Sequence, residues 1–148
     1  MATINPYLTL DGTCEEAFNF YKSVFGGEFT YLSKFGEMPP QEGMPPLSDE
    51  VKNRILHISL RISPDTILMG SDFIPGTHQQ VIGNNISISI DTKSQVEADQ
   101  IFNGLAVKAK ITMPLEETFW GAYFGMLTDD FGINWMVNYD DPAKIQPH

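Results

Sequence analysis

Two signals for the start of a helix lie 81 residues apart, and the same pattern follows each of them. Thr13-Cys14-Glu15-Glu16 and Ser94-Gln95-Val96-Glu97 have the spacing of a capping box, in which the hydroxyl accepts a hydrogen bond from a first-turn amide and the glutamate reaches back. Apolar residues follow each box at helical spacing, at four positions that correspond under the same displacement: Ala17, Phe20, Tyr21 and Val24, then Ala98, Ile101, Phe102 and Leu105. This repeat predicts two copies of one structural unit.

Strand patterns flank each predicted helix in the same order, one before the helix and three after it. The predicted strands are Ile4–Leu10, Glu28–Phe35, Leu56–Ile62 and Ile67–Phe73 in the first copy, and Ile86–Ile90, Ala109–Leu115, Ala122–Thr128 and Ile133–Tyr139 in the second. Each copy therefore reads strand, helix, strand, strand, strand, and the fold class is α+β. We expect one domain over residues 1–148, with module one at 1–75, a linker at 76–80 and module two at 81–142.

Alternation within the strands separates an apolar face from a polar one. His57, Ser59 and Arg61 point away from the apolar residues of their strand, and Tyr7 and Met136 have the same phase in theirs. The apolar sets are what helices would cover. The other sets are polar but seldom charged, which favours a concave cavity over bulk solvent on that side.

Composition restricts the partners and the compartment. Nineteen Asp and Glu residues against nine Lys and Arg give the 148-residue chain a formal net charge of −10. An acidic surface does not attract nucleic acid or an anionic membrane, so we expect neither as a partner. Cys14 is the only cysteine, which excludes an intramolecular disulfide, and no apolar run approaches the ~18 residues that span a membrane. We therefore expect a cytoplasmic protein.

Several segments resemble the PhnB-like branch of the vicinal oxygen chelate superfamily, which contains glyoxalases, bleomycin-resistance proteins and dioxygenases. The resemblance covers nearly the whole chain, and its most specific pieces are Phe119-Trp120-Gly121 and Asp130-Phe131-Gly132-Ile133-Asn134-Trp135. The other matching segments are Asn5–Gly12, Glu16–Gly27, Ile55–Leu60 and Leu68–Asp72. The resemblance implies two βαβββ modules that form a cupped, eight-stranded mixed sheet, in a homodimer.

Enzymes of this superfamily hold a divalent metal in the cup, through His and Glu side chains. In this sequence the four ligand positions fall on Asn5, the segment Met69–Ser71, Asn85 and Met136. Amides are weak ligands for transition metals and thioethers prefer soft ions, so we expect no metal cofactor. The alternative is a divalent ion such as zinc, nickel or iron on a different set, in which His57 and Asp72 join Glu116 or Glu117.

His57 and Asp72 are the candidate catalytic residues. His57 is either a general base or hydrogen-bond donor in the cavity, since its pKa suits proton transfer, or a structural histidine bonded to a neighbouring strand. Asp72 either orients His57 or caps the loop after its strand, and capping is the favoured interpretation. Cys14 lies in the first turn of a helix, where the amides favour a thiolate. No histidine motif accompanies it, so we do not expect a nucleophile.

The candidate ligand-binding residues are Tyr7, Arg61, Phe119, Trp120 and Met136. Tyr7 is the best ring for a cavity floor. Arg61 has a fork of donors for a carboxylate or phosphate, although a surface salt bridge is the favoured alternative. Phe119 and Trp120 either wall the mouth of a cavity or pack in a core or dimer contact. Trp135, by contrast, has the phase of a core residue.

These observations favour a homodimeric protein that binds a small molecule in the cup without a metal, or an enzyme of unknown substrate. The competing hypothesis is a metal-dependent lyase, isomerase or dioxygenase of the glyoxalase type, and fold analogy does not separate the two. A pure interaction module, the third possibility, would have no concave polar pocket. A methyltransferase activity is not expected, because no Gly-x-Gly loop lies between a strand and a helix to seat a nucleoside cofactor.

Overall fold

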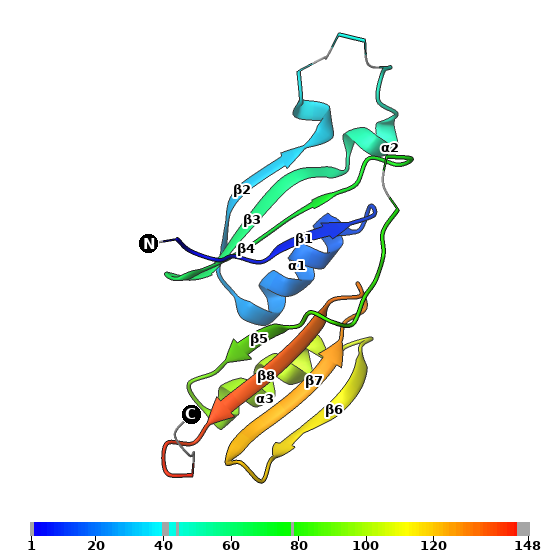
Figure 1. The fold of residues 1–148 in the computed structure, drawn as a ribbon. Helices are drawn as coiled ribbons and strands as arrows, with labels where there is room; N and C mark the ends of the chain where they lie inside the picture. Colours follow the sequence, from blue (N-terminus) through cyan, green and yellow to red (C-terminus); the bar gives the residue numbers. More distant parts are fainter. Residues whose placement is uncertain (1, 40–41, 44, 78, 145–148) are drawn as a thin grey trace. The chain divides into compact units, whose positions relative to one another are not determined.

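The computed structural model describes residues 2–39, 42–43, 45–77 and 79–144. The chain divides into two compact units, Met1–Val81 and Ile82–His148, and each unit contains one open four-stranded sheet with a helix packed on it (Figure 1). Both units have the order strand, helix, strand, strand, strand, which confirms the α+β class and the repeat. The eight strands form two mixed sheets of four. The module boundaries at 75 and 81 stay a prediction, and residue 78 of the predicted linker lies outside the described residues.

In the first unit, the sheet has the strand order β1-β4-β3-β2, with β1 parallel to β4 and the other neighbours antiparallel. Its elements are β1 (Tyr7–Leu10), α1 (Cys14–Phe25), β2 (Glu28–Lys34), a 3-10 turn η1 (Phe35–Glu37), α2 (Asp49–Lys52), β3 (Ile55–Ser63) and β4 (Thr66–Asp72). β1 begins three residues later than predicted because Pro6, which has no N–H to donate, precedes it.

In the second unit, the order β5-β8-β7-β6 repeats this topology, again with one parallel pair between the first strand and the last. Its elements are β5 (Ile88–Asp91), α3 (Gln95–Leu105), β6 (Lys110–Glu117), β7 (Ala122–Thr128) and β8 (Asn134–Asp140). The predicted strand at Ile86 begins two residues late, and Ile86 is exposed.

The two predicted capping boxes differ in outcome. At α3 the Ser94 hydroxyl accepts a hydrogen bond from the Glu97 amide at 3.1 Å, as predicted, while the Glu97 carboxylate accepts from the Lys93 amide at 3.0 Å. At α1 the prediction was wrong, because the Thr13 side chain makes no cap hydrogen bond. A carboxylate from β4, that of Asp72, accepts from the Cys14 amide instead, at 3.0 Å.

One face of each helix packs on its sheet. In α1 the buried residues are Cys14, Ala17, Phe18 and Tyr21, so Phe18 takes the fully buried place that the pattern assigned to Phe20. In α3 they are Ala98, Phe102 and Leu105. Trp135 is buried, as predicted, and its indole N–H donates to the Asp129 carboxylate at 2.8 Å. Among the residues described, no helix is both long enough and apolar enough to cross a membrane.

Candidate functional site

The first sheet has one face packed on α1 and one face turned away from it, which we call the open face of the first sheet. Leu8, Leu10, Ile58, Leu60 and Leu68 are buried on the α1 side. Side chains alternate along a strand and paired residues share a face. The register therefore gives the open face the set Tyr7, Thr9, Glu28, Tyr31, Ser33, His57, Ser59, Arg61, Ile67, Met69 and Ser71. The predicted polar face therefore exists, and β1, β2, β3 and β4 all contribute to it.

His57 lies at the centre of this face, between two tyrosines. Its Nδ1 is 3.4 Å from the Tyr7 hydroxyl and its Nε2 is 3.0 Å from the Ser59 hydroxyl. The imidazole centroid lies 5.7 Å from the ring of Tyr7 and 5.5 Å from the ring of Tyr31. Each hydroxyl can donate or accept, so both imidazole nitrogens have a partner in either tautomer and the orientation of the ring is held from two sides.

Two serines extend the polar surface beside His57. Ser59 is buried, and Ser33 is paired with His57 across β2 and β3. The Ser33 hydroxyl is buried and has no hydrogen-bond partner within the described part of the chain. Buried hydroxyls without a partner are uncommon in proteins. This face therefore has hydrogen-bonding capacity that the first unit does not use.

Asp72 is on the opposite face of the sheet from His57, since it shares the α1 side with Leu68 and Gly70. Its carboxylate accepts hydrogen bonds from the amides of Gly12, Cys14 and Ile55 at 2.9 to 3.0 Å. The structure thus does not bring the two candidate catalytic residues together. Asp72 instead joins the β1–α1 loop to β3.

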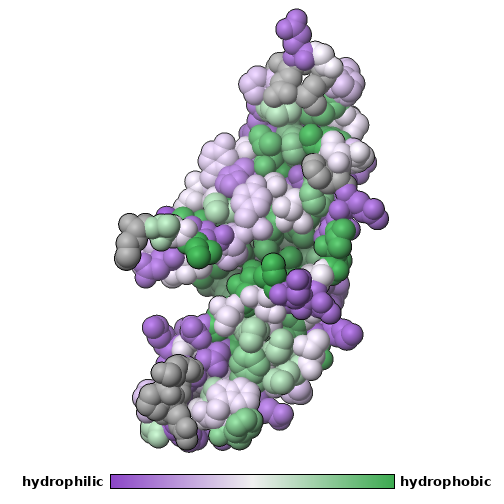
Figure 2. Space-filling model, viewed as in Figure 1, coloured by the Kyte–Doolittle hydropathy of each residue, from purple (hydrophilic) through white to green (hydrophobic). Residues whose placement is uncertain are grey.

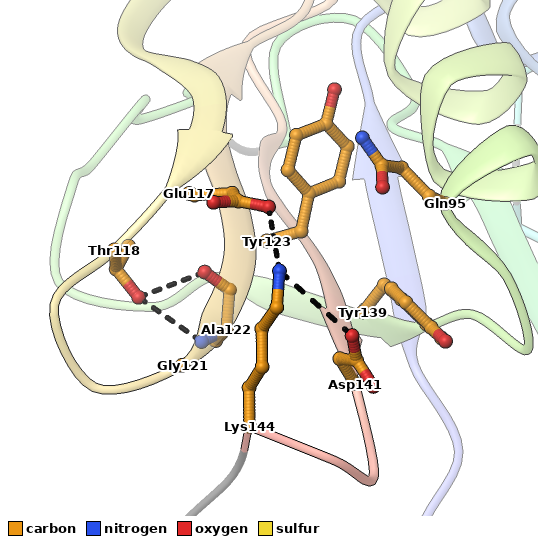
Figure 3. Close-up of a pocket in the computed structure, with 9 residues that line it drawn as sticks. All are labelled: Gln95, Glu117, Thr118, Gly121, Ala122, Tyr123, Tyr139, Asp141 and Lys144. Carbon is orange, nitrogen blue, oxygen red and sulfur yellow. Dashed lines mark hydrogen bonds and ion pairs between the residues drawn. The ribbon is translucent and has the colours of Figure 1, made fainter.

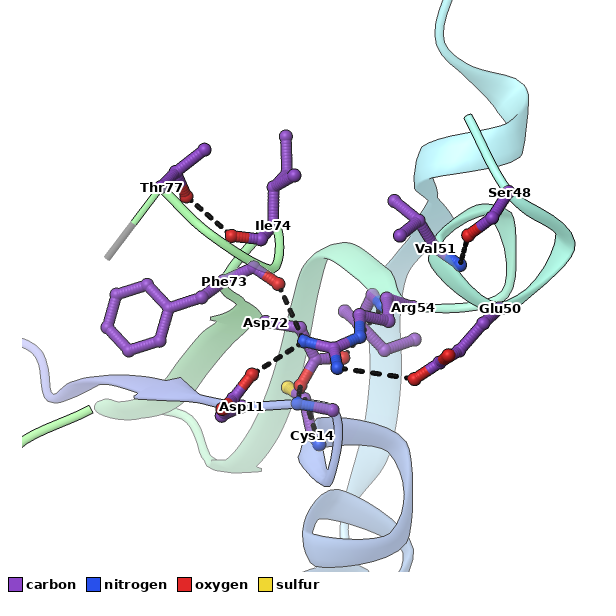
Figure 4. A network of polar contacts seen from close by, with 12 residues as sticks. Asp11, Cys14, Ser48, Glu50, Val51, Arg54, Asp72, Phe73, Ile74 and Thr77 are labelled. Carbon is purple, nitrogen blue, oxygen red and sulfur yellow. Dashed lines mark hydrogen bonds and ion pairs between the residues drawn. The ribbon is translucent and has the colours of Figure 1, made fainter. Parts of the chain in front are cut away.

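Arg54 extends this connection (Figure 4). Its guanidinium donates to the Asp11 carboxylate at 2.7 Å and to the Phe73 carbonyl at 2.9 Å, and it lies 3.6 Å from the Glu50 carboxylate. The hydrogen bond from Arg54 to Asp11 is the main reason why the pKa of Arg54 is raised. These contacts hold α2 and the first loop against the sheet, while the buried Nε of Arg54 has no hydrogen-bond partner among the described residues.

Cys14 lies beside the Asp72 carboxylate and has no exposed surface. Burial raises the pKa of its thiol, and the negative charges of Asp72 and Glu15 raise it further. One of the helix-terminal amides that would favour a thiolate, that of Cys14 itself, donates to Asp72. Cys14 is therefore a protonated core residue, in agreement with the expectation that it is not a nucleophile.

Arg61 lies on the same open face as His57 but farther along β3. It is exposed, and its guanidinium donates to the Pro64 carbonyl of its own turn at 3.0 Å. This contact is neither of the two roles expected from the sequence, and Arg61 stays exposed.

The second sheet also has a face turned away from its helix, α3, which we call the open face of the second sheet. Met136 lies on it, paired with Ser89 and Met126. In the β6–β7 turn, Phe119 is 98% exposed, and its ring meets that of Trp120 edge to face at 5.0 Å. Trp120 is in turn 6.2 Å from Phe124 on β7. Of the two predicted wall residues, only Trp120 thus packs back onto the sheet.

Sequence reasoning missed a small pocket on the α3 side of the second unit (Figure 3). Here the Tyr123 hydroxyl donates to the Asp99 carboxylate at 2.6 Å, which raises the pKa of Tyr123, and Lys144 pairs with Glu117 at 3.2 Å. The pocket holds about 40 Å³. Sites for organic ligands are roughly 300 Å³ or more, so it has room for ordered water only.

Comparison with known proteins decides the family. Residues 2–138 match the model of the family described as 3-demethylubiquinone-9 3-methyltransferase. The chain belongs to this PhnB-like family. It is 34% identical to the protein YjdN of Escherichia coli K12 over 97% of both chains. It is 38% identical to protein PA1353 of Pseudomonas aeruginosa, whose crystal structure matches with a TM-score of 0.82 over 95% of this chain and 98% of that one.

The fold extends beyond the PhnB-like family. A glyoxalase/bleomycin resistance protein/dioxygenase from Nocardioides matches with a TM-score of 0.59 and 15% identity, over 100% of this chain and 90% of that one. At this identity the likeness shows the fold alone. The superfamily resemblance seen in the sequence is therefore confirmed as a common fold.

The donor set of this PhnB-like chain does not fit the superfamily's usual metal. Asn5, Met69, Ser71, Asn85 and Met136 offer amide, thioether and hydroxyl groups, which are poor ligands for zinc, nickel or iron in the absence of His or carboxylate. The alternative set is also divided, because His57 and Asp72 lie on opposite faces of the first sheet. In the part of the chain that the structure describes, no three His, Cys, Asp or Glu side chains gather to hold a metal ion.

Proposed function

We propose that this PhnB-like protein binds a small organic molecule on the open face of the first sheet, around His57. The observation that carries the proposal is the position of His57 between the rings of Tyr7 and Tyr31, with both imidazole nitrogens held by hydroxyl groups. Aromatic walls with a few oriented polar groups are the usual composition of a small-molecule site. The family match supports a common fold and does not establish the ligand of this chain.

The chemistry of the face favours a flat molecule with one or two hydrogen-bonding groups. The tyrosine rings offer stacking surface, and the exposed Tyr7 hydroxyl beside His57 can donate to or accept from a ligand group. The net charge of −10 disfavours anions and suits a neutral or cationic ligand. Arg61 lies on the same face and is free to meet a single polar group at the edge of such a molecule.

A library of small neutral and cationic heteroaromatic compounds, screened by ligand-observed NMR, tests the proposal. Tyr31→Ala removes one ring wall and His57→Ala removes the central polar group, so each should weaken the hits at least tenfold. Tyr31→Phe is the matched control, because it keeps the ring that contacts His57, and it should change affinity by less than twofold. Hits that bind both alanine variants as well as the original protein would show that the site lies elsewhere.

We propose that binding at this face is independent of a metal. The competing function, a metal-dependent lyase, isomerase or dioxygenase, requires a bound divalent ion that the residues of the first sheet are poorly suited to hold. Elemental analysis of the purified protein separates the two. Stoichiometric zinc, nickel or iron that disappears in His57→Ala would overturn the metal-free proposal.

The homodimer and the cytoplasmic location stay predictions. Exposed apolar side chains on the edge strands, such as Tyr31 and Leu32 on β2 and Ile111 on β6, support self-association. Light scattering gives the oligomeric state of the chain directly, and cell fractionation gives its location.

A further inference from the structure

Three methionines lie side by side across the open face of the second sheet. Met113 on β6 is paired with Met126 on β7, in a stretch where register shifts separate Met113 from Ile111 and from Glu116, and Met126 is paired with Met136 on β8. Residues paired directly across neighbouring strands have their Cβ atoms about 5 Å apart and point to the same face. Figure 2 shows the hydrophobic, pale green side chains gathered over the middle of β7 and β8. We call Met113, Met126 and Met136 the methionine row.

The corresponding positions of the first sheet hold other residue types. There Tyr31, Ser59 and Met69 are paired across β2, β3 and β4, in the same topology. Met69 thus corresponds to Met136, while a tyrosine and a serine stand where the second sheet has Met113 and Met126. The topology of the sheet therefore does not require methionine at these positions.

Burial does not explain the methionine row either. Met113 is 39% exposed, whereas Met126 and Met136 are half-buried on the face that α3 leaves uncovered. Residues that fill a core lie on the α3 side of this sheet, where Leu127, Trp135 and Val137 are buried. The three methionines are partly accessible to solvent and lie in one line across three strands. Their thioether sulfurs together form a set of soft metal donors.

We propose that Met113, Met126 and Met136 bind a soft monovalent metal ion, copper(I) or silver(I), through their three sulfur atoms. Thioethers select soft ions and are poor ligands for zinc, magnesium or calcium. Methionine has three rotatable side-chain bonds, so the outer two sulfurs can turn toward a point above Met126. The charge of the unit favours a cation, because residues 82–148 hold nine acidic against four basic side chains.

The proposed site has a pH signature that separates it from a site made of cysteine or histidine. Binding to cysteine or histidine requires loss or absence of a proton and therefore depends on pH. A thioether does not titrate in this range, so binding to the methionine row should be the same at pH 5.5 and pH 8. Cys14 is buried and its pKa is raised, which keeps this thiol from competing in the folded chain.

Silver(I) titration of protein labelled with ¹³C at the methionine methyl groups tests the proposal, in nitrate buffer without chloride. One equivalent should shift the three methyl signals of the methionine row and leave that of Met69 in place. Met126→Leu keeps size and hydrophobicity, so it should fold normally by circular dichroism but weaken silver(I) binding at least tenfold. Met69→Leu is the matched control from the first sheet and should leave the affinity unchanged.

Anaerobic competition with a copper(I) chelator should give the same order of affinities for copper(I) among these variants. The proposal is wrong if silver(I) moves no methyl signal of the row at one equivalent. It is also wrong if folded Met126→Leu binds as tightly as the original protein, or if the affinity rises steeply between pH 5.5 and 8. Such a rise would assign the metal to a cysteine or a histidine.

Discussion

At the residue scale, the buried thiol of Cys14 links the stability of the fold to pH. Burial, Asp72 and Glu15 raise the pKa of Cys14 in the folded chain, whereas an unfolded chain releases this proton near pH 8.5. Above that pH the folded state holds one proton more than the unfolded state, so the free energy of unfolding falls as the pH rises. The stabilisation is complete below about pH 8.5 and is lost toward the folded pKa.

Urea denaturation at several pH values checks this prediction with Cys14→Ala as the comparison. Between pH 8.5 and 10, the original protein should lose up to about 1.4 kcal/mol per pH unit more than the variant does. Tyr123, whose pKa is also raised, is present in both proteins and cancels in the difference. Equal pH slopes for the two proteins would show that the folded chain does not retain the Cys14 proton.

The residue-scale features that the sequence did not predict depend on contacts between distant segments. Alternation along β3 correctly predicted that His57 and Ser59 share a polar face. It gave no sign of Tyr31, which reaches His57 from β2 only because the register pairs Tyr31 with Ser59. Likewise, the amide of Cys14 at the start of α1 donates to Asp72, which is 58 residues farther along the chain, and no local pattern at the Thr13 capping box predicts that contact.

At the element scale, an aromatic ring of each long helix packs against a glycine of the sheet below it. In the first unit a Cβ on Gly70 would lie 2.7 Å from the Phe18 ring, and in the second a Cβ on Gly125 would lie 2.8 Å from the Phe102 ring. Gly70 is on β4 and Gly125 on β7, which occupy different places in the two strand orders. Each glycine thus lies opposite the aromatic ring of the helix that packs on its sheet. In the first unit that ring belongs to Phe18, which therefore fills the core in place of Phe20.

Substitution at Gly125 should therefore destabilise the fold by a steric mechanism. An added Cβ would also lie 2.9 Å from the Leu115 backbone, and overpacking of this kind typically costs about 1–3 kcal/mol. Gly83→Ala is the matched control in the same unit, because its Cβ would meet nothing nearer than 3.6 Å. Denaturant melts should show the loss for Gly125→Ala and a change within about 0.5 kcal/mol for Gly83→Ala. Equal effects for the two variants would contradict the packing argument.

The order of the elements was predictable because hydrophobic periodicity and cap residues are local signals. All eight strands and both long helices occur where the pattern placed them, with ends that move by up to three residues. The 3-10 turn η1 (Phe35–Glu37) and the short helix α2 (Asp49–Lys52) were not predicted, because three or four residues are too few to show a hydrophobic period. Which strands pair, and in which register, required the folded chain.

At the whole-molecule scale, one strand–helix frame is used twice with different chemistry on its open face. The first unit has a histidine between tyrosines there, and the second has the methionine row. The excess of acidic side chains, however, is the same in both. Residues 1–81 hold ten acidic against five basic side chains and residues 82–148 hold nine against four, so each unit has a net charge of −5.

Because both units have the same sign of charge, the folded chain is under self-repulsion that salt should relieve. The Debye length shrinks from about 30 Å at 0.01 M salt to about 8 Å at 0.15 M, so we expect the melting temperature to rise by a few degrees over this range. Salt also weakens the described ion pairs, such as Lys144–Glu117, but exposed pairs contribute at most about 1 kcal/mol each. The excess of ten negative charges should therefore dominate.

Thermal melts followed by circular dichroism in a sodium chloride series check this expectation, and the isoelectric point provides the control. Near pH 4.5, the sequence pI, the net charge is close to zero and the same salt series should leave the melting temperature almost unchanged. A rise of similar size at pH 7 and at pH 4.5 would indicate a general effect of the salt on protein hydration. A fall at pH 7 would mean that the ion pairs outweigh the repulsion, and the acidic surface would then stabilise the fold through its local partners.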